Sequence, residues 1–415
     1  MAKYKKILVY VIILLVFFDN LWIDFLKFPT AIRYLNDVLI VISLIVCRKQ
    51  IRQFVNMNVA KAIIFFSLML LPGLMIHGGA FPLILWAFRN IYRFFAFYFI
   101  CVFLLDKADV IRIFDIFCIV YYLNLVFCLI EYFILGKTRD YLGGIFGISK
   151  GCNSYLNIYL CIVLLYVIYK YLKEKVSVGY MIFILCSAML IAGLAELKIA
   201  FIEIILIIGC IWVMNRDSKR MRTIAVTGVA VIAIGLLVLM MIAPRHFRVM
   251  INPVNLLEYA NTEEGGYSLS RLHAFSSIND LIFHDNLLMN LFGLGFGNCE
   301  YSAVSFLRSP FYHEYGQYHY RWFMHQTLFL ETGYAGLFSY IGILATVLYD
   351  AWKCRKQQKD EWIHEIVLIM CLLAVINIWY DASLRSENAY IIWFVLAASA
   401  IVSARRKDDD KCSNL

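Results

Sequence analysis

The chain has 415 residues, of which 62% are hydrophobic and only 16% are charged, with a mean hydropathy of +0.75. A soluble globular domain carries about 25% charged residues, so this composition excludes a soluble protein and indicates a polytopic membrane protein. The formal net charge of +9 does not point to nucleic acid, because the cytoplasmic loops of membrane proteins are rich in Lys and Arg.

The first apolar run, 7–18, is followed by Asp19 and more apolar residues without a small-residue cleavage site, so we expect a retained span and no cleaved signal peptide. Because a membrane-spanning helix needs about 20 apolar residues, the chain is predicted to be all-α with about twelve transmembrane helices. Their predicted ranges are 7–26, 31–47, 60–76, 82–105, 112–135, 154–172, 179–195, 197–214, 223–243, 323–349, 362–380 and 388–404. Only Glu196 separates the seventh from the eighth, which predicts a tight re-entrant hairpin; the alternative is one interrupted segment.

These spans divide the chain into three parts. Residues 1–243 hold the first nine spans, 244–322 form a long polar extracytoplasmic loop, and 323–415 hold the last three spans and a charged tail. If the N-terminus is cytoplasmic, most of the 38 Lys and Arg residues fall in cytoplasmic segments, as the positive-inside rule requires. Both termini are therefore predicted to be cytoplasmic. We find no internal repeat, which disfavours transporter folds built from duplicated halves.

Arg89 and Arg93 fall inside the fourth predicted span. Spaced four apart, they share one helix face, and charges within a bilayer usually face a cavity or pair with an anion. One interpretation is that they bind a ligand phosphate in the outer half of the span. The alternatives are an internal ion pair with Glu131 or Glu203, or extension of Arg89 to the outer headgroups.

Lys198 lies at the outer tip between the seventh and eighth spans, and Glu203 follows it on the same helix. A lone Lys at the end of a span is most often an interfacial anchor. Its position beside the other outer cations also makes Lys198 a candidate ligand-binding residue. Cys152 and Cys299 both fall in segments predicted to be outside, where they could form a disulfide.

The long loop contains a segment, 270–291, whose apolar residues recur at near-helical spacing. We predict an amphipathic helix there, lying on the outer membrane face. Arg271 is near its start, and Ser268 and Ser270 are possible caps. The glycines at 293, 295 and 297 follow. They are not a dinucleotide-binding fingerprint, because no strand precedes them; they form either a flexible turn or a place where backbone approaches a ligand closely.

The loop ends in an aromatic, His-rich run, SPFYHEYGQYHYRWFMH. Its aromatic residues suit an interfacial belt and could also stack on sugar rings. His313, His319 and His325 are spaced by six, which suits neither a helix face nor a short metal-binding motif, so we expect no metal. His325 differs from the other two because it falls where the loop enters the tenth span.

These residues resemble the O-antigen ligase and polymerase family of envelope polysaccharide assembly. That family has a long external loop ending in a His, which is followed by a short motif of Leu, Glu and Gly. The matching residues here are His325, Leu328, Glu331, Gly333 and Gly336.

Upstream, the family has a Ser-Arg that opens a helix, then a glycine-rich turn, and an Arg at the outer tip of an earlier span. The matches here are Ser270–Arg271, the glycines from Gly293 to Gly297, and Lys198 in the sequence ELK. The chain departs from the family by this Lys and by Gln326, which stands where the family has Asn. The resemblance is specific over about 270–336.

The resemblance implies an integral-membrane glycosyltransferase fold of the C type and a donor glycan linked to undecaprenyl diphosphate. It implies a metal-independent reaction with no cofactor, in which cations hold the leaving diphosphate and a base takes the proton of the acceptor hydroxyl. The cations would be Arg271 and Lys198, with Arg89 and Arg93 as further candidates. His325 is the candidate base, with an ordinary pKa near 6.5 that neighbouring cations should lower.

Glu331 would orient or charge-balance the same catalytic site. The implied protein is a polysaccharide repeat-unit polymerase in the bacterial plasma membrane, which contacts the bilayer and has a chain-length regulator and a flippase as candidate partners, with no role for nucleic acid. We prefer a polymerase because polymerases are frequent in such loci. One alternative is a ligase that transfers the finished glycan to another acceptor. An alternative from a different class is a transporter or flippase of lipid-linked sugars.

The predicted topology can be tested by cysteine labelling in intact cells. A cysteine placed at Asn261 should react with a membrane-impermeant thiol reagent, because the loop faces outward. A cysteine placed at Ser218 should react only after permeabilisation. The wild-type chain, with its own 12 cysteines, gives the background. The reverse pattern would contradict the topology.

Overall fold

The computed structural model describes residues 2–50, 57–242, 269–358 and 361–412, with a few isolated positions between 244 and 258. All regular elements in these ranges are helices, which confirms the predicted all-α polytopic membrane protein. Nine of the described helices are long and apolar enough to cross a membrane. They are α1 (Ala2–Asp24), α4 (Asn58–His77), α5 (Phe81–Leu104), α6 (Lys107–Phe133), α7 (Cys152–Leu172), α9 (Lys198–Asn215), α10 (Lys219–Ile242), α16 (Met324–Gln357) and α17 (Ile363–Tyr380).

The other three predicted spans contain helices that are shorter than a membrane crossing. They are α2 (Tyr34–Val46), α8 (Val178–Leu194) and the apolar part of α18 (Ala389–Cys412). A 3-10 turn at Thr30–Arg33 after Pro29 delays the start of α2. The turn between α8 and α9 is only three residues long, with Glu196 at a φ of 53°. The predicted hairpin is therefore formed by two separate helices.

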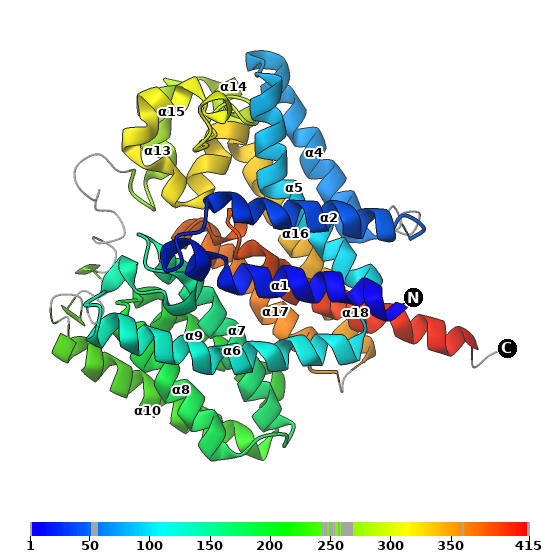
Figure 1. Cartoon of the computed structure of the whole chain (residues 1–415), viewed down its shortest axis with the longest axis vertical. Coiled ribbons are helices and arrows are strands. Elements are labelled where there is room, and N and C mark those ends of the chain that lie inside the picture. The colour runs from blue at the N-terminus through cyan, green and yellow to red at the C-terminus, as the bar shows by residue number, and fades with distance from the viewer. Residues whose placement is uncertain are drawn as a thin grey trace.

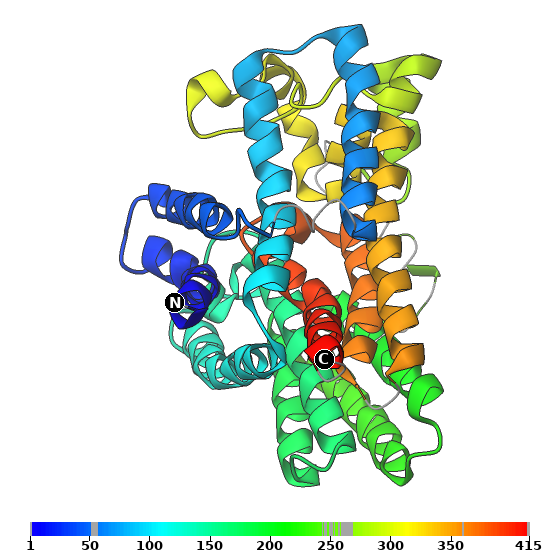
Figure 2. The ribbon, with the colours of Figure 1, turned by 90° about the vertical axis from the view of Figure 1, so that its right-hand side faces the viewer.

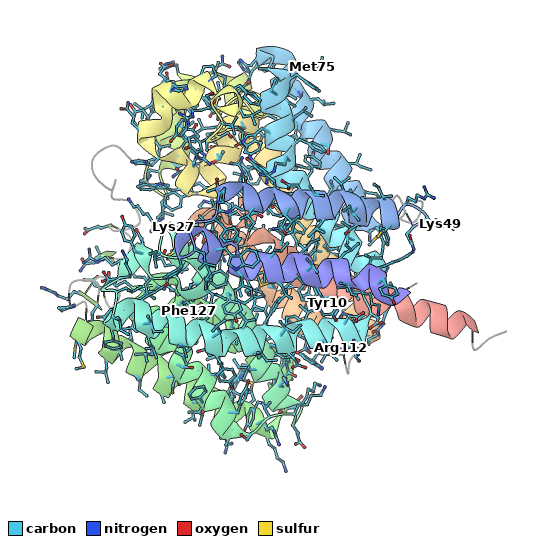
Figure 3. The ribbon with its side chains drawn as sticks, in the orientation of Figure 1. Tyr10, Lys27, Lys49, Met75, Arg112 and Phe127 are labelled. Atoms are coloured by element: carbon cyan, nitrogen blue, oxygen red, sulfur yellow. The ribbon has the colours of Figure 1, made fainter. Side chains whose placement is uncertain are left out.

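The helices pack around a buried centre made by α7 and α18, whose apolar residues are almost fully enclosed. Both ends of the chain lie on one side of the molecule (Figures 1 and 2). Lys49, just beyond the end of α2, lies on that side, and Lys27 lies on the opposite side (Figure 3). Lys49, which was predicted to be cytoplasmic, and Lys27, which was predicted to be external, thus lie on opposite sides of the bundle.

The part of the long loop from 269 to 322 folds against the first half of α16 and the adjoining ends of α4 and α5 (Figure 1). It has a small apolar core of its own, which includes Ile278, Phe283 and Tyr320 and packs on Phe329 of α16. Its helices are α13 (Ala274–Ile278), a π-helical turn (Asn279–Phe283), α14 (Leu287–Phe292) and α15 (Pro310–Tyr315). Short 3-10 turns complete the fold at Arg139–Tyr141, Gly144–Phe146, Ser305–Leu307, Gly316–Tyr318, Tyr320–Trp322 and Ser383–Arg385.

The single amphipathic helix predicted over 270–291 is wrong. His284 and Asp285 adopt positive φ values of 49° and 60°, which ends the first helical segment, and the Asn286 side chain caps α14. Periodicity alone did not reveal this break, because the apolar spacing continues through it. Ser268 and Asn261 lie outside the described residues.

The glycines of the loop meet a break in α16. Gly333 has a φ of 58° and a ψ of −163°, so the helix is interrupted there. The Leu294 N–H donates to the Leu330 carbonyl at 2.8 Å, and the Gly295 N–H donates to the Glu331 carbonyl at 3.1 Å. A Cβ on Gly293 would lie 2.3 Å from the Thr332 nitrogen. Gly293 thus packs on the backbone of α16, while Gly295 packs on the backbone of α4 at Gly73 and Gly297 on that of α5 at Leu83.

Gly293→Ala should destabilise the protein by about 3 kcal/mol or more, because an alanine would combine a positive φ with overlap onto fixed backbone. Gly342→Ala is the matched control, since nothing lies within 4 Å of that Cβ position in the same helix. We expect a clearly lowered Tm for the first variant and an unchanged or slightly raised Tm for the second. Equal Tm values would contradict the interlocking of the two backbones.

Candidate functional site

His325 lies at the start of α16 and is fully buried. Its Nδ1 lies 3.2 Å from the Ile378 carbonyl oxygen, near the end of α17. A carbonyl oxygen can only accept a hydrogen bond, so a neutral ring bonded to Ile378 carries its proton on Nδ1. Nε2 has no hydrogen-bond partner within the described residues. The Trp379 ring stacks on the imidazole with centroids 5.6 Å apart.

Arg271 lies beside His325. Its guanidinium carbon lies 4.8 Å from the Phe323 ring centre and 5.6 Å from that of Tyr380. The Arg271 backbone also approaches the His325 ring, and the Arg271 charge acts on that ring. The structure thus places a cation and a potential base, which are 54 positions apart in sequence, in the same buried region.

Gln326 explains how α16 holds Arg271. Its side-chain amide donates to the carbonyl of Ser270 at 3.2 Å, and to that of Leu269 at 3.4 Å. The Ser270 hydroxyl in turn accepts from the His273 N–H at 2.9 Å. The residue that departs from the family pattern therefore fixes the backbone that carries Arg271.

Asp381 is a site residue that the sequence analysis missed. It directly follows α17 and is buried, and its backbone carbonyl accepts from the Met324 N–H at 2.9 Å. One carboxylate oxygen accepts from the Ser383 N–H at 2.7 Å, and the other has no partner among the described residues. Burial raises the pKa of Asp381 to about 7, although the Arg271 charge acts in the opposite direction.

Glu331 belongs to a different cluster from His325. Its carboxylate accepts from the Cys299 N–H at 3.3 Å and lies near Glu300 and Arg385. Arg385 and Glu300 form an ion pair whose side chains are almost fully buried. A second Glu300 oxygen accepts from the Asn90 amide at 3.2 Å. Glu331 therefore lies where the glycine turn, α5 and the α17–α18 connection meet.

Arg89 and Arg93 are paired with acidic residues that the sequence analysis did not consider. Arg93 donates to Glu387 at 2.7 Å and lies 3.5 Å from Asp37, and Arg89 lies 2.7 Å from Asp37. The Arg89 guanidinium also lies 4.8 Å from the Trp86 ring centre. These contacts support the ion-pair interpretation of both arginines.

The partners predicted for that ion pair, Glu131 and Glu203, are wrong. The Glu131 carboxylate accepts from the backbone N–H groups of Gly143 and Gly144, at 3.1 and 2.7 Å. Glu203 accepts from the amides of Asn157 at 2.6 Å and Asn377 at 3.2 Å. A helix has many neighbours in a bundle, and the sequence does not say which of them it contacts.

Lys198 is the first residue of α9. This helix connects to the site through Glu203, because Asn377 lies one turn before Asp381 on α17 and donates to Glu203. The charge of Asp381 also acts on Glu203. Lys198 thus begins the helix that carries Glu203, which lies near Asp381. The role of Lys198 in ligand binding stays a prediction.

The connection between α17 and α18 brings these clusters together. Asp381 lies beside Arg271, Arg385 pairs with Glu300, and Glu387 pairs with Arg93. The sequence contained a signal for this arrangement, since three charged residues occur within seven positions between two apolar spans.

Cys152 and Cys299 are free and buried, so the possible disulfide does not form in this structure. Within the described ranges, no group of three or more His, Cys, Asp or Glu side chains is arranged to hold a metal ion. Comparison with models of known protein families and with curated proteins finds no match to this chain.

Asp381→Asn should change how stability depends on pH. The pKa of Asp381 in the folded protein is about 7, above the value of 3.8 for the free group, so folding favours the protonated form. The stabilising contribution is complete below about pH 4 and is lost as the pH rises towards 7. The wild-type Tm should therefore fall between about pH 4 and 7, and the Asn variant should lack this part of the fall.

Asp217→Asn, at an exposed position in the turn before α10, is the control and should keep the wild-type pH dependence. An unchanged slope in Asp381→Asn would show that Asp381 is not buried beside Arg271 as described.

Proposed function

We propose that this protein is a membrane glycosyltransferase of the polysaccharide-polymerase type. It transfers a glycan from undecaprenyl diphosphate to a saccharide hydroxyl at the outer face of the bacterial plasma membrane. The observation that carries the proposal is the placement of Arg271 and His325 against the same Phe323 ring, whose centre lies 4.8 Å from the Arg271 guanidinium carbon and 6.0 Å from the imidazole centre. A cation and a base are the two groups that this transfer requires.

In the proposed reaction, the acceptor hydroxyl attacks the anomeric carbon of the donor sugar. The new glycosidic C–O bond forms as the bond from that carbon to the diphosphate oxygen breaks. Nε2 of His325 takes the proton of the hydroxyl, and undecaprenyl diphosphate leaves with the bonding electron pair. Arg271 stabilises the charge that develops on the diphosphate, so a metal ion is not obligatory.

The remaining predicted residues have different places in this proposal. Arg89 and Arg93 contribute to the frame, because their guanidinium groups are already paired with Asp37 and Glu387. Glu331 holds the glycine turn through the Cys299 N–H. Lys198 remains a proposed diphosphate ligand.

One observation, the interruption of helix α16, favours the transporter alternative. Discontinuous helices in transporters offer unpaired backbone groups to a ligand near the middle of the membrane. Here the carbonyls of Leu330 and Glu331, before the break, accept from the Leu294 and Gly295 N–H groups. The loop therefore occupies the two carbonyls at the break, which argues against a ligand site there. We favour the enzyme over the transporter. A ligase uses the same two groups and differs from a polymerase only in its acceptor.

The proposal is tested with purified full-length protein and an undecaprenyl-diphosphate-linked oligosaccharide. His325→Ala should lose at least about a hundredfold in turnover, the range that general bases contribute, while still binding the donor. Arg271→Ala should lose donor binding and turnover, and Arg271→Lys should recover part of them at best, because Lys lacks the bidentate fork.

His313→Ala, on the exposed side of α15, is the control and should keep wild-type turnover. Full turnover in His325→Ala would overturn its assignment as the base. Loss of folded protein in that variant would indicate that His325 has a structural role, through its contact with Ile378. In a deletion strain, single repeat units on the acceptor would indicate a polymerase, and polymer left on the carrier lipid would indicate a ligase.

A further inference from the structure

Two arginines of the long loop stack on the same tyrosine, away from the His325 region. The guanidinium carbon of Arg321 lies 4.4 Å from the Tyr301 ring centre, and that of Arg308 lies 5.0 Å from it. Arg321 also lies 5.8 Å from the Tyr312 ring, which packs against Tyr301 with centroids 4.6 Å apart. We call these four residues the arginine–tyrosine cluster.

The positive charge of this cluster is not balanced within the described part of the chain. Neither Arg308 nor Arg321 forms an ion pair with a described acidic residue. Glu300 is the acid whose charge reaches Arg321, and Glu300 is already paired with Arg385. Two like charges held near one ring repel each other, and an anion placed between them would relieve that repulsion.

The donor groups of the cluster are largely unused. Arg308 donates from Nε to the Ser302 carbonyl at 3.0 Å, which leaves its terminal nitrogens available. The Arg321 guanidinium donates no hydrogen bond to a residue in the described ranges, although it is only partly exposed. Guanidinium groups in this state match the paired oxygens of a carboxylate or phosphate.

The backbone of both tyrosines in the cluster is hydrogen-bonded to neighbouring side chains. The Trp86 side chain of α5 donates to the Tyr301 carbonyl at 3.0 Å, and the Ser309 hydroxyl accepts from the Tyr312 N–H at 3.1 Å. Stacking on the rings fixes the arginine side chains before any ligand arrives, which lowers the entropic cost of binding.

The cluster is also joined to the proposed catalytic region. Tyr301 follows Glu300, which is fixed by Arg385 of the α17–α18 connection. Arg321 lies two residues before Phe323, the ring against which Arg271 packs. A long glycan chain held near Arg271 could therefore also reach the cluster, since both lie on the folded loop.

We infer that the arginine–tyrosine cluster is a recognition subsite for an acidic sugar of the glycan, bearing a carboxylate or phosphate group. Arg308 and Arg321 bind the oxyanion, and the faces of Tyr301 and Tyr312 pack against the sugar ring. An anionic lipid headgroup offers the same oxyanion but no sugar ring to pack on the two tyrosines. This inference deepens the proposed function and rests on it for the identity of the glycan.

The test measures binding of a digalacturonate disaccharide and of the matching neutral galactose disaccharide. Full-length protein is placed in phosphatidylcholine nanodiscs and titrated by calorimetry at low salt. The acidic disaccharide should bind about tenfold more tightly than the neutral one, and salt should reduce the difference. Arg321→Gln and Arg308→Gln should each remove most of it. Tyr301→Phe, which keeps the ring, should retain it, whereas Tyr301→Leu should not.

Arg139→Gln is the control for the loss of an exposed arginine, since Arg139 pairs with Glu196 on another loop. Equal binding of the two disaccharides would overturn the subsite, as would full binding in both arginine variants. If Arg321→Gln does not fold, Arg308→Gln decides the question. Loss of the disaccharide signal when phosphatidylglycerol is added to the nanodiscs would assign the cluster to a lipid headgroup and overturn the glycan subsite.

The outcome is separable from that of the proposed function. Arg271→Ala should keep the preference for the acidic disaccharide while losing transfer from the lipid-linked donor. Preferential binding of the acidic disaccharide without any transferase activity would support the subsite and contradict the proposed function. Transferase activity without this preference would support the proposed function and contradict the subsite.

Discussion

The buried ion pair between Arg385 and Glu300 is the contact on which the arrangement of the candidate site depends. It joins the α17–α18 connection to the turn that follows the loop glycines, and Glu331 of α16 lies against both. Removing one partner of such a pair leaves an unpaired buried charge, at a cost of about 3–5 kcal/mol. The same connection carries Asp381 towards Arg271, so the geometry of the proposed catalytic region follows from how this short segment is fixed.

The second constraint is the hydrogen bonding of the main chain where α16 is interrupted. α16 is interrupted at Gly333, and the carbonyls before the break accept from the loop at Leu294 and Gly295. In a membrane protein, each backbone group freed from a helix must find another partner, because lipid offers none. The loop supplies these partners at Leu294 and Gly295, which explains how the turn around these residues is held against the apolar bundle.

Much of the fold could be predicted, because it depends on local composition. Hydropathy identified each helix of the bundle, and the hairpin at Glu196 was expected from a single charged residue. The interruption at His284 and Asp285 could not be predicted, because two non-glycine residues adopt a positive φ there. At the site, the sequence indicated His325 and Arg271, since a His at a loop-to-span junction and an Arg near a predicted helix start are local signals.

Composition and hydropathy are enough to predict an all-α membrane protein with one long polar loop, because apolar length and charge distribution are properties of short segments. Which charges meet depends on how the helices pack. Arg93 pairs with Glu387, which is 294 positions away, and Arg271 lies against Tyr380, next to Asp381, because the end of α17 packs beside the start of α16. A buried charge is stabilised by whichever opposite charge the packing brings near, and packing between helices distant in sequence leaves no periodic signal within either one.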